Sequence, residues 1–98
     1  MYTIAWAYRV PPDKQAEFEQ AYSSNGAWVE LFKKGRGYLG TKLIRTDLLF
    51  ENYATIDTWE TKEDYEAFLI QWKEEYEKLD EQCQQLTESE SYLGSFEK

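Results

Sequence analysis

The sequence predicts a small α+β domain whose strands and helices follow the order βαββαβ. Three observations support this prediction: an alternating apolar segment opens the chain, two strand-like segments flank a central turn, and a long apolar stripe with helical spacing follows. The 98 residues suffice for one core but not for two. We therefore expect residues 1–98 to form one ferredoxin-like domain, a four-stranded antiparallel sheet with two helices on one face.

Residues 2–10 are the first predicted strand, because large side chains alternate there with small or polar ones. A Pro-Pro pair ends this strand and suits the start of a helix. The helical pattern that follows is interrupted at residues 23–26 and resumes over residues 27–34. In the resumed part, Trp28 and Phe32 lie four residues apart and share one helix face.

Residues 38–46 and 52–60 predict two strands of an antiparallel hairpin, with a turn near residues 47–51. If Arg45 lies opposite Tyr53, all odd-numbered residues of the hairpin share one face. The side chains expected to face the helices are then Leu39, Leu43, Thr55, Asp57 and Trp59. Those expected on the other face include Tyr38, Ile44, Ala54 and Ile56.

Thr61 is the predicted N-cap of the second helix, with Asp64 three residues on. The stripe that follows, over about five turns, is the strongest periodic signal in the chain. It consists of Tyr65, Phe68, Leu69, Trp72, Tyr76, Leu79 and Cys83. A polar link then leads to a last strand around residues 91–96.

The formal charge of −8 argues against nucleic acids and anionic membrane surfaces as partners. Residues 1–50 carry seven Lys or Arg against five Asp or Glu, whereas residues 51–98 carry four against fourteen. We expect most of the acidic excess to form a solvated helix face, and a contact with a complementary partner is the alternative. No stretch has the length of a membrane span or the pattern of a leader, so a cytoplasmic location is expected.

The chain contains no histidine, which excludes Ser–His and Cys–His catalysis and His-ligated zinc or haem. The single cysteine, Cys83, excludes a disulfide framework and a cysteine metal cluster. Cys83 occupies an apolar helical position, which favours a small core residue over a reactive thiol.

Seventeen aromatic side chains are more than a small monomer buries easily. Two helices cover only one face of the predicted sheet, yet the other face also carries apolar residues. An apolar sheet face left in water promotes association. The sequence therefore predicts a homodimer that packs sheet on sheet.

Two groups of motifs resemble the antibiotic biosynthesis monooxygenase family, whose members are dimeric α+β barrels. The first group is Phe18, Tyr22, the Asn25-Gly26-Ala27-Trp28 segment, Leu31 and Phe32. The second is Gly37-Tyr38-Leu39-Gly40-Thr41 and Ile56-Asp57-Thr58-Trp59-Glu60-Thr61, with Tyr65 and Phe68 after it. The likeness covers nearly the whole chain, and it identifies the fold better than the activity.

The resemblance implies a cavity between the sheet and the helices. Strand alternation places Ile4, Trp6 and Tyr8 there, beside the helix-facing hairpin residues. The residues expected to roof it are Trp28, Phe32, Tyr65, Phe68 and Trp72. Such a lining suits a small, flat aromatic or phenolic ligand, and the alternative is that these rings fill the core.

The resemblance also implies a chemistry that needs no cofactor, in which the substrate anion itself reduces oxygen. Candidate groups are Asp57 as base, Trp59 and Trp6 as stacking or N–H donors, Tyr8 and Tyr53 as hydroxyl donors, and Arg45 as anion stabiliser. Asp57 is the most informative of them, because a carboxylate on the helix-facing side is costly to bury without a partner. The alternative is a structural Asp57 bonded to Thr41, to Tyr65 or to a cation.

Haem-degrading relatives keep a tryptophan at the position of Trp59, but they also use a histidine ligand and an asparagine on the first strand. This chain has no histidine and places Trp6 where the asparagine would stand. We therefore expect no cofactor. Three functions stay open: a cofactor-free monooxygenase, a non-catalytic protein that binds a small molecule, and a purely structural dimer.

Overall fold

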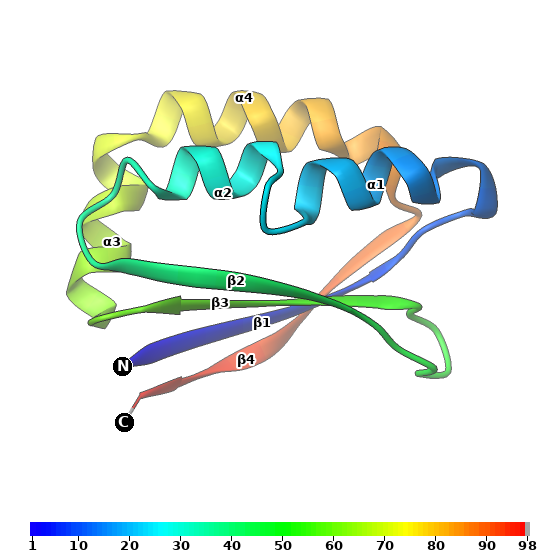
Figure 1. The fold of residues 1–98 in the computed structure, drawn as a ribbon, viewed down its shortest axis with the longest axis horizontal. Coiled ribbons are helices and arrows are strands. Elements are labelled where there is room, and N and C mark those ends of the chain that lie inside the picture. The colour runs from blue at the N-terminus through cyan, green and yellow to red at the C-terminus, as the bar shows by residue number, and fades with distance from the viewer. Residues whose placement is uncertain (98) are drawn as a thin grey trace.

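A computed structural model describes residues 1–97 of the chain. Its strands are β1 (Tyr2–Arg9), β2 (Tyr38–Arg45), β3 (Tyr53–Trp59) and β4 (Ser89–Glu97). Its helices are α1 (Gln15–Tyr22), α2 (Ala27–Phe32), α3 (Lys62–Gln71) and α4 (Lys73–Cys83), with short 3₁₀ turns at Pro12–Lys14 and Gln84–Leu86. All helices lie on one side of the sheet (Figure 1), which confirms the predicted α+β architecture.

The four strands lie in the order β2-β3-β1-β4, and every neighbouring pair is antiparallel. The hairpin register is the predicted one over most of its length, because Arg45 pairs with Tyr53 and Thr41 pairs with Asp57. Since side chains alternate between the two faces, this register fixes which residues point toward the helices.

The start of β2 corrects one prediction. Tyr38 pairs with Trp59 and Gly40 with Thr58, so Leu39 is an extra residue in a β-bulge. Gly40 has a φ of +155°, which glycine adopts at little cost. The bulge turns Tyr38 to the helix side, where its ring centroid lies 5.3 Å from that of Trp59, and leaves Leu39 50% exposed.

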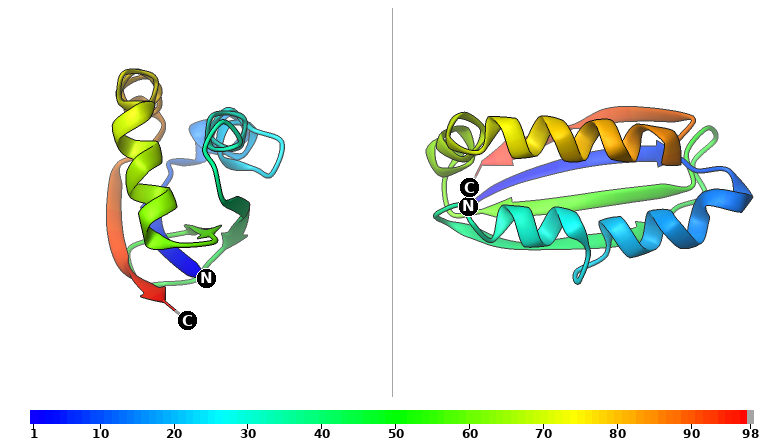
Figure 2. Two further views of the ribbon diagram at one scale, coloured as in Figure 1. Left: turned by 90° about the vertical axis from the view of Figure 1, so that its left-hand side faces the viewer. Right: turned by 90° about the horizontal axis from the view of Figure 1, so that it is seen from above.

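The second predicted helix is broken into α3 and α4 at Trp72, whose φ of −111° and ψ of 27° are not helical. No proline or glycine lies there. The two segments pack against different partners, since α3 contacts β3 and α4 contacts α2. Tertiary packing thus bends a stripe that local periodicity predicts as continuous, and Figure 2 shows α4 lying lengthwise beside α2 and α1. The predicted N-cap is confirmed, because the Asp64 N–H donates to Thr61 Oγ1 at 3.0 Å.

The main core lies between the sheet and the helices. Its largest fully buried side chains are Trp59, Tyr53, Phe18, Phe68 and Val10. Cys83 is buried at the edge of this core, as predicted, and burial raises the pKa of its thiol. It is therefore a weak nucleophile.

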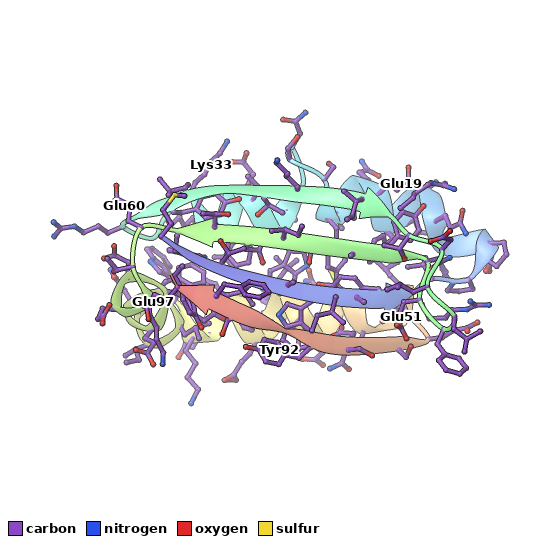
Figure 3. The ribbon with its side chains drawn as sticks, turned by 90° about the horizontal axis from the view of Figure 1, so that it is seen from below. Glu19, Lys33, Glu51, Glu60, Tyr92 and Glu97 are labelled. Atoms are coloured by element: carbon purple, nitrogen blue, oxygen red, sulfur yellow. The ribbon has the colours of Figure 1, made fainter. Side chains whose placement is uncertain are left out.

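The opposite face of the sheet carries no helix (Figure 3). Antiparallel pairing places Thr3, Ala5 and Ile56 there, together with Ile44 and Phe96, which are 43% and 64% exposed. Lys42 and Thr58 lie on the same face, so it is open and mostly apolar, the feature on which the homodimer prediction depends. Within residues 1–97, none of the helices has both the length and the apolar character needed to span a membrane.

Candidate functional site

A pocket of about 140 Å³ opens between the sheet and the helices. It is lined by Trp6, Tyr8, Tyr22, Trp28, Phe32, Thr41, Thr55, Asp57, Tyr76, Asp80 and Glu90. Pockets that hold drug-sized ligands measure roughly 300–1,000 Å³. This one suits a molecule of one or two rings.

The floor of the pocket comes from all four strands. The central strand β1 contributes Trp6 and Tyr8, which pair with residues of β3 on one side and of β4 on the other. The Tyr8 hydroxyl lies 3.0 Å from Thr55 Oγ1, within hydrogen-bonding distance. Because β1 alternates large inward residues with alanines, the sequence itself presents these two rings to the helices.

The roof of the pocket is aromatic and comes from three helices. Trp28 of α2 is 6% exposed, and its ring centroid lies 5.1 Å from that of Tyr76 of α4 and 6.0 Å from that of Tyr22 of α1. The buried Trp28 indole lies within interaction distance of the Tyr22 hydroxyl and the Cys83 thiol, where it opposes the effect of burial on the pKa of both groups. The roof is therefore held together by contacts among its own side chains.

Asp57 is the carboxylate on the floor. Thr41 Oγ1 donates a hydrogen bond of 2.6 Å to Asp57 Oδ1 and lies 2.6 Å from the Tyr38 hydroxyl, so a chain of polar groups leads to this acid. No ion pair involves Asp57 within the described part of the chain. Desolvation raises the pKa of Asp57 to about 6, although the hydrogen bond from Thr41 lowers it.

The tyrosine hydroxyls of the pocket cannot act as bases near neutral pH. Burial, the largest cause in each case, raises the pKa of Tyr8, Tyr22 and Tyr76 well above the ordinary value of 10.0. These groups stay protonated and serve as hydrogen-bond donors or acceptors. Asp57 is thus the floor residue best suited to accept a proton.

Two further carboxylates stand near the mouth of the pocket. Asp80 comes from α4 and Glu90 from β4, where Glu90 pairs with Tyr8 across the strands. Desolvation and then the negative charge of Asp80 raise the pKa of Glu90, so these two acids lie close enough to repel each other. No Lys or Arg within residues 1–97 lines the pocket.

The structure brings five of the predicted site residues together around this pocket: Trp6, Tyr8, Trp28, Phe32 and Asp57. It places four others outside the lining, in or beside the packed core: Trp59, Tyr65, Phe68 and Trp72. Trp59 is completely buried, between Tyr38 and Phe68 at centroid distances of 5.3 and 5.2 Å. Because of the bulge at Leu39, the Tyr38 ring packs against Trp59. The predicted register places Tyr38 on the other face of the sheet.

The remaining two predicted residues lie elsewhere. Arg45 is exposed at the end of β2, where its Nη2 atom lies 3.0 Å from Glu19 Oε2 of α1. The Tyr53 hydroxyl also donates to Glu19 Oε2, and these two hydrogen bonds, Tyr53 first, lower the pKa of Glu19. Neither Arg45 nor Tyr53 lines this pocket, but both line a second pocket that shares Thr41 with it.

Sequence reasoning assigned no pocket role to Tyr22, Tyr76, Asp80 and Glu90. Asp80 carries a usable signal, because it lies four residues after Tyr76 and therefore on the same helix face. Glu90 lies outside the predicted last strand, because β4 begins at Ser89, two residues before residue 91.

The fold and the pocket together define a class, a small α+β protein with an aromatic and acidic pocket between a four-stranded sheet and its helices. The antibiotic biosynthesis monooxygenase model matches residues 1–71, and the chain belongs to that family. A search of curated protein sequences finds no match.

Solved structures confirm the fold. Haem-degrading MhuD from Mycobacterium tuberculosis, with two haems in its active site, superposes with a TM-score of 0.68 at 21% identity, covering 100% of this chain and 95% of that one. A mutant of SnoaB, a cofactor-independent oxygenase from Streptomyces nogalater, gives 0.69 at 15% identity over 99% and 91%. A protein from Nitrosomonas europaea described as an antibiotic biosynthesis monooxygenase gives 0.71 at 14% identity over 100% and 98%.

Proposed function

We propose that this protein is a cofactor-independent monooxygenase that binds a small aromatic molecule in the pocket between sheet and helices. Asp57 is the proposed base, and Trp6, Tyr8, Trp28 and Phe32 hold the aromatic rings. The observation that carries the proposal is a partly buried carboxylate without a cationic partner, at the floor of an aromatic pocket. Membership of the monooxygenase family and the SnoaB-like fold support it.

A two-ring phenol such as 1-naphthol illustrates the proposed reaction. Asp57 takes the hydroxyl proton, and the electron-rich phenolate then reduces O₂. The carbon opposite the hydroxyl loses its hydrogen and gains one oxygen atom as a carbonyl, while the second oxygen atom leaves as water. The products are 1,4-naphthoquinone and water, so the reaction balances without an added reductant. A pKa of about 6 suits Asp57 to this task, because the group is mostly ionised at neutral pH but binds a proton readily.

Oxygen uptake with a panel of two-ring phenols, including 1-naphthol, tests this function. If Asp57 is the base, Asp57→Asn lowers turnover about 100-fold or more and leaves ligand affinity within about threefold. Asp47→Asn is the matched control, because Asp47 is exposed on the hairpin turn. Equal losses of turnover and affinity in Asp57→Asn would assign Asp57 to binding or packing instead.

One observation favours a non-catalytic binding protein as the second candidate. The Asp57 carboxylate already accepts a hydrogen bond from Thr41, as a structural acid would. Under this function the pocket binds the same ligands, but ¹⁸O₂ leaves no label in any of them. A purely structural dimer would show neither binding nor turnover.

We also propose that the chain is a homodimer through the open sheet face. The apolar residues of that face, with Ile44 and Phe96 exposed, would be covered by the same face of a second copy. Sedimentation velocity at micromolar concentration should show a dimer, and Ile44→Glu should shift it toward the monomer. A stable monomer of the unaltered chain would contradict this proposal.

A further inference from the structure

The charge of the pocket conflicts with the chemistry proposed for it. Deprotonating a phenol places a new negative charge on the substrate. The lining already carries three carboxylates, Asp57, Asp80 and Glu90, and no cation among residues 1–97 lies beside them. The one cation expected to stabilise the new charge, Arg45, is bound to Glu19 outside the pocket. An anionic ligand would therefore be repelled at every stage.

The three acids are also spread along the pocket. Asp57 pairs with Ile4 on one side of β1, and Glu90 pairs with Tyr8 on its other side. Strand geometry then separates their backbones by about 10 Å across the sheet and about 13 Å along it. No three acidic, cysteine or histidine side chains of the described chain approach closely enough to hold a metal ion. A single metal ion therefore cannot bridge these groups, but an organic cation can contact some of them while its rings occupy the aromatic part of the lining.

We propose that the natural ligand is a small aromatic molecule that carries a protonated nitrogen, with its rings held between Trp6 and Trp28 and its protonated nitrogen directed to Asp80 and Glu90. This inference rests on the proposed function and narrows its substrate class. The aromatic lining suits such a ligand further, because Trp and Tyr faces attract cations.

Calorimetry with three probes of one two-ring skeleton tests the inference at pH 7.5. The probes are 4-aminoquinoline, which is cationic, quinoline, which is neutral, and quinoline-4-carboxylate, which is anionic. We expect the cation to bind roughly tenfold tighter than the neutral probe and the anion to bind weakest. Raising the salt concentration should reduce the difference in affinity between the cationic and the anionic probe.

Two variants locate the effect. Glu90→Gln should reduce the preference for the cation to about twofold, whereas Glu81→Gln should leave it unchanged, because Glu81 lies on α4 outside the pocket. Equal losses in both variants would show a general attraction to the acidic surface and overturn the inference. Equal binding of the three probes, or preference for the anion, would also overturn it while leaving the pocket intact. If none of the probes binds, the proposed function itself fails.

Discussion

The space between sheet and helices has two ends that are built from the same kinds of residue but differ in content. At one end, Trp59 packs against Phe32, Tyr38, Tyr65 and Phe68 and is completely buried. The fit is so close that a Cβ added at Gly35 would lie 2.9 Å from the Trp59 ring. At the other end, the lining of Trp6, Tyr8 and Trp28 encloses about 140 Å³.

The two ends differ in the number of charged side chains that they contain. The open end contains Asp57, Asp80 and Glu90, and charged groups need water or a ligand around them. At the filled end, the ring partners of Trp59 among residues 1–97 are all uncharged aromatic side chains. An aromatic stripe by itself therefore does not indicate a binding site. Acids interspersed among the rings are the better indicator.

Removal of the ring at the filled end should have the largest effect on stability. We expect Trp59→Ala to lower the free energy of unfolding by about 3–5 kcal/mol, because it leaves a cavity among packed rings. Urea denaturation measures this loss. Trp6→Ala, at the partly exposed open end, is the matched comparison and should cost clearly less. Equal losses would show that the two ends are packed alike.

The carboxylate at the open end should make stability depend on pH. Because the pKa of Asp57 is raised from 3.8 to about 6, the folded state binds a proton more tightly than the unfolded state. The contribution of this group to stability is therefore greatest below pH 4 and is lost as pH rises toward 6.

Asp57→Asn should accordingly stabilise the protein at pH 7.5 by about 1–3 kcal/mol, less the value of the weakened bond from Thr41. Thermal unfolding between pH 4 and 8 measures the effect against Asp47→Asn. A destabilised Asp57→Asn protein at pH 7.5 would show that the hydrogen bond outweighs desolvation.

Arg45→Ala should have the smallest effect. Arg45 lies outside the space between the sheet and the helices, where it forms an exposed ion pair with Glu19. We expect turnover and ligand affinity to stay within about twofold of the unaltered protein, because exposed ion pairs contribute little. Calorimetry and oxygen uptake measure both quantities. A large loss of turnover without loss of affinity would restore Arg45 to the catalytic role that the sequence suggested.

Much of the fold follows from sequence because its elements are periodic. Alternation in residues 2–10 and in the hairpin predicts three strands and most of the hairpin register, and the Thr61 cap lies where predicted. The break at Trp72 does not follow from local pattern, since packing of α3 and α4 against different partners produces it. The bulge at Leu39 shifts a single residue, but it exchanges the faces of Leu39 and Tyr38.

The site was predictable only in part. Strand alternation places Trp6, Tyr8 and Asp57 on the inner face, because that face follows from register alone. It cannot tell which inner residues line a void and which fill one, and so Trp59 and Phe68 were expected in the pocket. Arg45 lies on the predicted face of the sheet, but its side chain forms an ion pair with Glu19 of α1 and does not reach the pocket. No pattern within a strand indicates this ion pair.

The central claim is that one end of this space receives a ligand and the other does not, and the four tryptophans report on both. In ¹H–¹⁵N NMR spectra titrated with 4-aminoquinoline, the indole signals of Trp6 and Trp28 should move with increasing ligand. The signals of Trp59 and Trp72, which lie outside the pocket lining, should stay in place. Movement of Trp59 as large as that of Trp28, or no movement of any indole at saturating ligand, would contradict the account.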